Sequence, residues 1–157
     1  MLVSHTMRTL LKTSDVPIRD TKLIAQNIAK ELGSREWFCL WLIGEIGSGK
    51  TFMTREILRA LGYPPSVPVT SPTFTYLNDY EVNGKRFGHL DFYRADANLP
   101  LALNILDDYD FDGLFVEWPE KVEKTEARIR PTHILELRKS NDLSTRDYIF
   151  LCTEEAR

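Results

Sequence analysis

The residues with the clearest chemical signature are the eight from Gly44 to Thr51, which read GEIGSGKT. The glycines of this octapeptide let successive backbone N–H groups converge on a phosphate, where a Cβ would block the close approach. Lys50 has the reach to contact β- and γ-phosphates, and the Thr51 hydroxyl is suited to ligate Mg²⁺. The pattern is that of a phosphate-binding loop, or P-loop. It predicts ATP and Mg²⁺ as ligands, contacted by Glu45, Ile46, Gly47, Ser48, Gly49, Lys50, Thr51 and Phe52.

Magnesium nucleotide chemistry also needs a carboxylate at the end of a neighbouring strand, and the sequence offers two. Asp91 stands in RFGHLDFYR and Glu117 in GLFVEWPE. A lone strand-end Asp is more often a cap or the partner of a cation such as Arg94. Beside a P-loop we favour function for both, so that Asp91, Glu117 and Lys50 form the catalytic group. His89 alternates with Asp91, and we favour a structural hydrogen-bonding role for it.

Two further features are less specific. Ser71-Pro72-Thr73-Phe74 lies where many P-loop proteins carry a loop that senses the γ-phosphate through a hydroxyl. A Ser/Pro turn before a strand explains the local sequence equally well. Trp118 could wall the nucleotide pocket or fill the core, and its local sequence favours the core.

These residues need strands and helices to hold them. Residues 37–43 form a nearly continuous apolar run, which predicts a strand buried on both faces. A helix should begin near Gly49, carry its apolar residues on one side and stop at Gly62. This strand, loop and helix form the first half of a parallel α/β unit. Before them we expect a helix over residues 21–32 with Asp20 as its N-cap.

The rest of the chain predicts further strands. Asn83-Gly84 separates two strand-like runs, and both residues tolerate the positive φ of a type I′ hairpin turn. Asn98 is suited to cap a short helix with Pro100 in its first turn. The expected strands of this part are 74–82, 85–93, 113–117, 133–137 and 147–152.

Length and composition bound the class of protein. The 157 residues suit one domain, 1–157, in which we expect 1–19 to be an irregular N-terminal extension. A net charge of -3 argues against a protein that neutralises nucleic-acid phosphates directly. No apolar stretch reaches the length of a membrane span and the N-terminus lacks a signal-like apolar segment, so we expect no membrane association and a cytoplasmic location.

Four motifs occur in a fixed order: GEIGSGKT, SPTF, HLDFYR and VEWPE. Together they resemble the TsaE (YjeE) family over residues 20–138. The resemblance implies an α/β P-loop NTPase-like three-layer sandwich whose central sheet is mainly parallel with an antiparallel portion. It also implies that Thr51 and Glu117 bind the metal, that Asp91 is catalytic, that Thr73 is the switch hydroxyl and that Trp118 moves towards the site.

TsaE-like proteins serve the modification of tRNA to N6-threonylcarbamoyladenosine (t6A) at adenosine 37. The resemblance implies an accessory, Mg²⁺-dependent ATP hydrolase that works with TsaB and TsaD subunits and meets tRNA only through that complex. The chain departs from the family after Arg94, where residues 96–101 read DANLPL in place of an acidic segment similar to DPEEL. If this part contacts the partner subunits, the docking surface differs here.

Two other functions compete with this interpretation. A small P-loop kinase would phosphorylate a metabolite, but it normally needs an Arg-rich lid, and no basic residue lies between Arg94 and Lys121. A non-hydrolysing scaffold would bind ATP only to order residues 71–80. We expect slow hydrolysis by the isolated chain, because no arginine is clearly placed to meet transition-state charge, and we name residues 13–21 and Arg146 as candidates for contact with the base.

Overall fold

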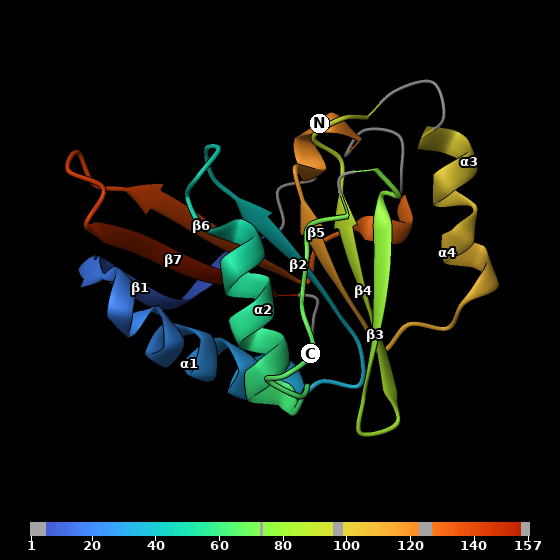
Figure 1. Ribbon diagram of the computed structural model, residues 1–157, viewed down its shortest axis with the longest axis horizontal. Coiled ribbons are helices and arrows are strands. Elements are labelled where there is room, and N and C mark those ends of the chain that lie inside the picture. The colour runs from blue at the N-terminus through green and yellow to red at the C-terminus, as the bar shows by residue number, and fades with distance from the viewer. Residues whose placement is uncertain (1–5, 73, 96–98, 123–126, 155–157) are drawn as a thin grey trace.

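The computed structural model describes residues 6–72, 74–95, 99–122 and 127–154. All its strands join one seven-stranded sheet in the order β1-β7-β6-β2-β5-β4-β3 (Figure 1). The strands are β1 (Met7–Pro17), β2 (Phe38–Ile43), β3 (Leu77–Val82), β4 (Lys85–Asp91), β5 (Gly113–Glu117), β6 (His133–Lys139) and β7 (Thr145–Thr153). The helices are α1 (Thr21–Gly33), α2 (Lys50–Leu61), α3 (Leu99–Leu103) and α4 (Ile105–Asp108), with 3-10 turns η1 (Ile18–Asp20), η2 (Pro119–Lys121) and η3 (Ala127–Ile129).

The sheet is parallel in its centre and antiparallel at both edges. Strands β6, β2, β5 and β4 run parallel, while β1 and β7 add antiparallel pairings on one side and β3 adds one on the other. In the β3-β4 hairpin, Asn83 and Gly84 both have positive φ, 51° and 80°, as the type I′ turn requires. The expected α/β sheet with parallel and antiparallel portions is confirmed.

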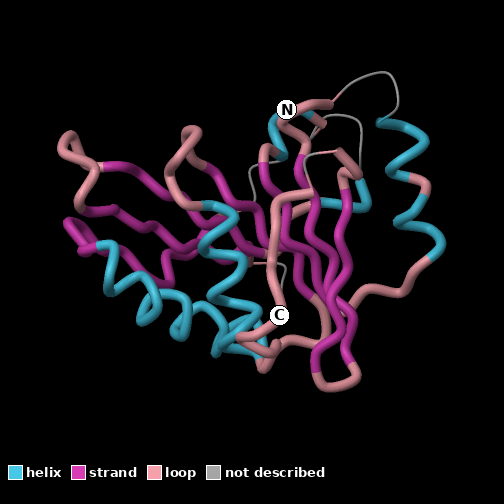
Figure 2. Tube along the Cα trace, in the orientation of Figure 1, coloured by secondary structure: helices cyan, strands magenta, loops and turns pink. Residues whose placement is uncertain are grey.

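The sheet separates two cores because β2 sends alternate residues to opposite faces. Leu40 and Leu42 join the core beneath α1 and α2, the pair of helices in front of the sheet in Figures 1 and 2. Cys39 and Trp41 join a second core, to which α3 contributes Leu103 and η3 contributes Ile129. A sheet covered on both faces is the expected three-layer arrangement.

Two expectations from the sequence are wrong, and a third concerns a residue that the structure does not describe. The irregular extension over 1–19 is wrong for Met7–Pro17, which form β1 along the edge of β7 (Figure 1). The strand expected from residue 74 begins only at Leu77, because Tyr76 adopts a φ of 62° and donates its N–H to the Pro72 carbonyl at 2.9 Å. Asn98, the expected helix cap, lies outside the described residues.

Other boundaries shift by a few residues. Strand β4 ends at Asp91 and not at residue 93, while β6 and β7 extend beyond the ranges expected for them. Within the described parts of the chain, no helix combines the length and the apolar character that crossing a membrane requires.

Candidate nucleotide and magnesium site

The P-loop connects the C-terminal end of β2 to the first turn of α2. Two of its glycines hold positive φ, Gly47 at 77° and Gly49 at 101°, a region that residues with a Cβ rarely adopt. Gly44 is needed for a different reason, since a Cβ there would lie 2.7 Å from the Leu137 carbonyl oxygen. Helix α2 begins at Lys50, as expected, so the positive end of its dipole faces the loop.

Lys50 is buried, and its ammonium group faces the inside of the loop. Its Nζ donates to the carbonyl oxygens of Gly44 at 2.6 Å and Glu45 at 2.9 Å, and lies 4.3 Å from the centroid of the Trp118 ring. Burial lowers the pKa of Lys50, while nearby carboxylates, Glu117 foremost, act in the opposite direction. The cation therefore sits where a phosphate bound in the loop would meet it.

Glu117, at the end of β5, is the centre of a buried polar group. Its carboxylate accepts hydrogen bonds from Thr51 Oγ1 at 3.0 and 3.1 Å, and Oε2 lies 2.5 Å from His89 Nε2. Only 3% of Glu117 and none of His89 is exposed. The two residues named as metal ligands, Thr51 and Glu117, are thus in direct contact, and hydroxyl and carboxylate oxygens are ligands that Mg²⁺ prefers.

Asp91 lies directly opposite Glu117 in the parallel pairing of β4 with β5. Its Oδ2 accepts a hydrogen bond from Ser71 Oγ at 2.6 Å, and its Oδ1 accepts one from the Tyr93 N–H at 2.9 Å. Ser71, the first residue of SPTF, is therefore attached to the Asp91 carboxylate, to which we gave a catalytic role on sequence grounds. Thr73, the hydroxyl named as the switch, lies outside the described residues.

The remaining predicted contacts form the rim of the site. Ile46 is 62% exposed and Phe52 39% exposed. Ser48 is buried, and its hydroxyl has no hydrogen-bond partner among the described residues, so it is an orphaned donor inside the loop. Trp118 is half-buried and packs against the second core, and its ring lies tilted against that of Tyr93 with 5.0 Å between the centroids. Because Lys50 Nζ lies 4.3 Å from the centroid of the same ring, Trp118 contacts both the core and the P-loop lysine.

Three residues beyond the predicted set contribute to the site. Lys139, at the end of β6, donates from Nζ to the Ile46 carbonyl at 2.8 Å, and nothing in the local sequence signals this. Arg146, named only as a candidate for base contact, donates to the carbonyls of Ser48 at 3.1 Å and Gly47 at 3.3 Å, and its contact with a base stays a prediction. The third is His89, whose alternation with Asp91 was the only signal of its contact with Glu117.

The set of donors fits a magnesium nucleotide. A buried ammonium group, a loop with two left-handed glycines and an orphaned hydroxyl suit the phosphates, and the pair Thr51 and Glu117 suits Mg²⁺. Phosphate groups and Mg²⁺ would compete with contacts that these side chains now make with the protein itself. The site therefore has the chemistry for binding and for hydrolysis of a nucleoside triphosphate.

Comparisons with known proteins identify the family of this chain. The family model described as "Threonylcarbamoyl adenosine biosynthesis protein TsaE" matches residues 17–148. The chain is 34% identical to a protein of that name from Haemophilus influenzae, over 66% of this chain and 65% of the relative, which is just under two thirds of the relative's length. It is 35% identical to the namesake from Aquifex aeolicus, over 65% of this chain and 71% of the relative. The crystal structure of YdiB from Bacillus subtilis aligns with a TM-score of 0.69 at 23% identity, covering 97% of this chain and 90% of that one, and supports the fold alone.

Proposed function

This chain belongs to the TsaE family of threonylcarbamoyl adenosine biosynthesis proteins, and on that premise we propose that it is a Mg²⁺-dependent ATPase. Its ATP hydrolysis would serve t6A modification of tRNA in association with TsaB- and TsaD-like subunits in the cytoplasm. The observation that carries the proposal is the contact between Thr51 and Glu117 at the mouth of the P-loop, 3.0 Å from oxygen to oxygen. Here a hydroxyl from the first turn of α2 meets a buried carboxylate at the end of β5.

Each residue has a separate task in the proposed reaction. Lys50 exchanges its two carbonyl partners for phosphate oxygens and so supplies positive charge at the transferred group. Thr51 and Glu117 would hold the metal, which when bound would neutralise negative charge on the phosphate oxygens and orient the phosphates. Asp91, fixed by Ser71, is the carboxylate that we assign to orient the attacking water.

The isolated chain should turn over slowly. Among the described residues, Arg146 is bonded to the P-loop, but it donates to the carbonyls of Gly47 and Ser48 and therefore stabilises the loop. An arginine that meets the transition-state charge is worth about 10³ to 10⁵ in rate for related reactions. We propose that partner subunits supply or organise this missing element.

The first experiment measures nucleotide binding by calorimetry and phosphate release for the wild type and for Lys50→Ala. The matched control is Lys85→Ala, an exposed lysine at the start of β4, whereas the P-loop follows the opposite, C-terminal ends of the parallel strands. We expect loss of ATP binding only in Lys50→Ala, because that variant alone removes the cation inside the loop. Equal ATP affinity in both variants would contradict the assigned site, and phosphate transfer to a metabolite in place of water would favour the kinase.

The second experiment tests the partners. Purified TsaB and TsaD are captured with this protein in ATP and in ADP, and phosphate release is measured with and without them. Since coupling is reciprocal, a nucleotide that changes affinity for the partner must have its own affinity changed by the same factor. Equal capture in both nucleotides together with unchanged turnover would contradict partner control.

A further inference from the structure

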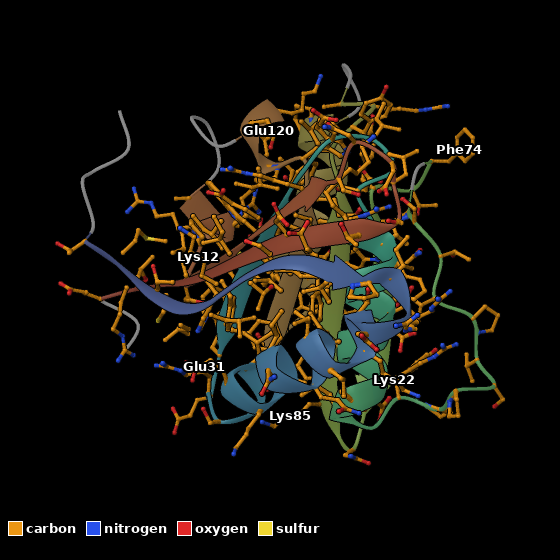
Figure 3. The ribbon with its side chains drawn as sticks, turned by 90° about the vertical axis from the view of Figure 1, so that its left-hand side faces the viewer. Lys12, Lys22, Glu31, Phe74, Lys85 and Glu120 are labelled. Carbon is orange, nitrogen blue, oxygen red and sulfur yellow. The ribbon has the colours of Figure 1, made fainter. Side chains whose placement is uncertain are left out.

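A second group of metal-binding side chains lies on α1, β6 and β7, separate from the residues of the P-loop site. Glu31 is near the end of α1, His133 begins β6 and Cys152 lies near the end of β7. A carboxylate oxygen, an imidazole nitrogen and the sulfur of these residues all lie within 4.8 Å of one another. Figure 3 shows Glu31 at the outer end of α1.

We propose that Glu31, His133 and Cys152 form a binding site for a zinc ion that joins α1 to the edge of the sheet. Oxygen, nitrogen and sulfur ligands together favour a borderline-soft cation over Mg²⁺. The distance from Glu31 Oε1 to His133 Nε2 is 3.2 Å, close to the separation of two ligands on one tetrahedral zinc. The thiolate has to move inward by about 1 Å to complete the set, given zinc–ligand bonds of roughly 2.0–2.3 Å.

Contacts within the protein already orient the His133 imidazole so that its Nε2 faces the proposed zinc site. Its Nδ1 lies 2.7 Å from Thr132 Oγ1, and its ring stacks on Phe150 at 5.5 Å between centroids. Such a partner on the far nitrogen fixes the ring and leaves Nε2 towards the metal, as outer partners of metal-bound histidines do.

Burial and access both suit an ion. His133 is fully buried and Cys152 is 3% exposed, while 27% of the Glu31 side chain meets solvent and provides the way in. The other cysteine does not compete, because burial raises the pKa of the Cys39 thiol far above its usual range. A fourth position is left for water.

The guanidinium group of Arg35 occupies part of the proposed zinc site. Its guanidinium pairs with Glu31 and its Nη2 lies 3.9 Å from Cys152 Sγ, so metal and guanidinium compete for the same two ligands. Arg35 also lines a cavity of about 290 Å³ whose wall includes the carboxylate residue Asp112, and this gives the side chain room to move when metal enters. Removing the guanidinium should therefore strengthen metal binding.

The test uses the full chain without nucleotide, in excess Mg²⁺ to occupy oxygen-only sites, with Co²⁺ as the spectroscopic substitute for zinc. One equivalent of Co²⁺ should give the absorption of a cobalt–thiolate bond, and Zn²⁺ should displace it. Cys152→Ala should abolish this absorption. Glu31→Gln should weaken binding at least about tenfold, the lower limit for loss of even an outer-shell partner, whereas Glu36→Gln, an exposed neighbour, should change nothing.

Arg35→Gln separates a metal site from a simple ion-pair network, because only a metal site gains affinity when the competing cation is removed. Zinc should also raise the melting temperature of the wild type but not that of Cys152→Ala. Absence of the thiolate absorption in the wild type and in Arg35→Gln would overturn the proposal. If Cys152→Ala does not fold, an unchanged affinity in the surface variant Glu31→Gln would overturn it equally.

Discussion

The pairing of His89 with Glu117 leads to a quantitative prediction about the nucleotide-free protein. His89→Phe keeps a planar ring of similar size but removes the nitrogen that lies 2.5 Å from the buried carboxylate. A hydrogen bond to a charged group contributes about 1.5–3 kcal/mol to stability. His89 Nδ1 has no partner among the described residues, and removing that buried polar atom returns about 1 kcal/mol.

The free energy of unfolding of His89→Phe should therefore fall by about 0.5–2 kcal/mol, the difference between these two effects. The pair itself is isolated by a double-mutant cycle with Glu117→Gln, which preserves the shape of the side chain and removes its charge. We expect a coupling energy of about 1.5 kcal/mol or more between the two positions, because residues in one hydrogen-bonded pair are not additive.

Urea unfolding of the four proteins, without nucleotide and Mg²⁺, gives the coupling energy. The control repeats His89→Phe in the background of Glu120→Gln, an exposed carboxylate on η2, where the effects should add. Additivity of His89→Phe and Glu117→Gln within about 0.5 kcal/mol would refute the reasoning, since distant, independent sites behave in that way.

Three further expectations concern separate features. Lys50→Ala should weaken ATP binding by at least about tenfold in calorimetry, a loss of about 1.4 kcal/mol, and unchanged affinity would contradict its role. Gly44→Ala should lower the free energy of unfolding by about 1–3 kcal/mol, as overpacking does, because the new Cβ meets the Leu137 carbonyl at 2.7 Å; wild-type stability in urea would show that the loop adapts. Backbone and hydroxyl hydrogen bonds from Ser144 lower the pKa of Asp142 to about 2, so its contribution to stability is present above the ordinary carboxyl pKa and is lost as pH falls towards 2. An NMR titration that places Asp142 near its ordinary value of 3.8 would contradict this.

The sequence predicted well those elements that are specified by their own short stretch of residues. Six apolar residues in succession predicted β2. Asn83-Gly84 predicted the β3-β4 hairpin, because these two residue types tolerate the positive φ that its turn needs. Strand β1 had no such signal. Its register shifts between Thr9 and Leu11 and again between Thr13 and Val16, which interrupts the alternation that an amphipathic strand would show.

The site divides in the same way. The P-loop and the carboxylate at the end of β5 were predictable, because each needs only a short motif in its proper place. The contacts of Lys139 and Arg146 with the P-loop carbonyls depend on which strand lies beside β2, and this is decided by pairing between distant segments. The sequence placed His89 in alternation with Asp91 and favoured a structural hydrogen-bonding role for it, but its contact with Glu117 follows from the register of β4 on β5.

The charged groups of the site are bonded to the protein itself, and this bears on how nucleotide could control the protein. Lys50 is bonded to two loop carbonyls, and the Glu117 carboxylate is bonded to Thr51 and His89. A phosphate or a metal ion therefore gains only the difference between its own contacts and those it displaces. Because Ser71 bonds directly to Asp91, a rearrangement at the carboxylates would reach the loop that follows the P-loop helix without any long chain of contacts. If bound nucleotide and metal replace these hydrogen bonds by others, the site has two arrangements, and a partner that recognises one of them would shift nucleotide affinity by the same factor by which nucleotide shifts its own.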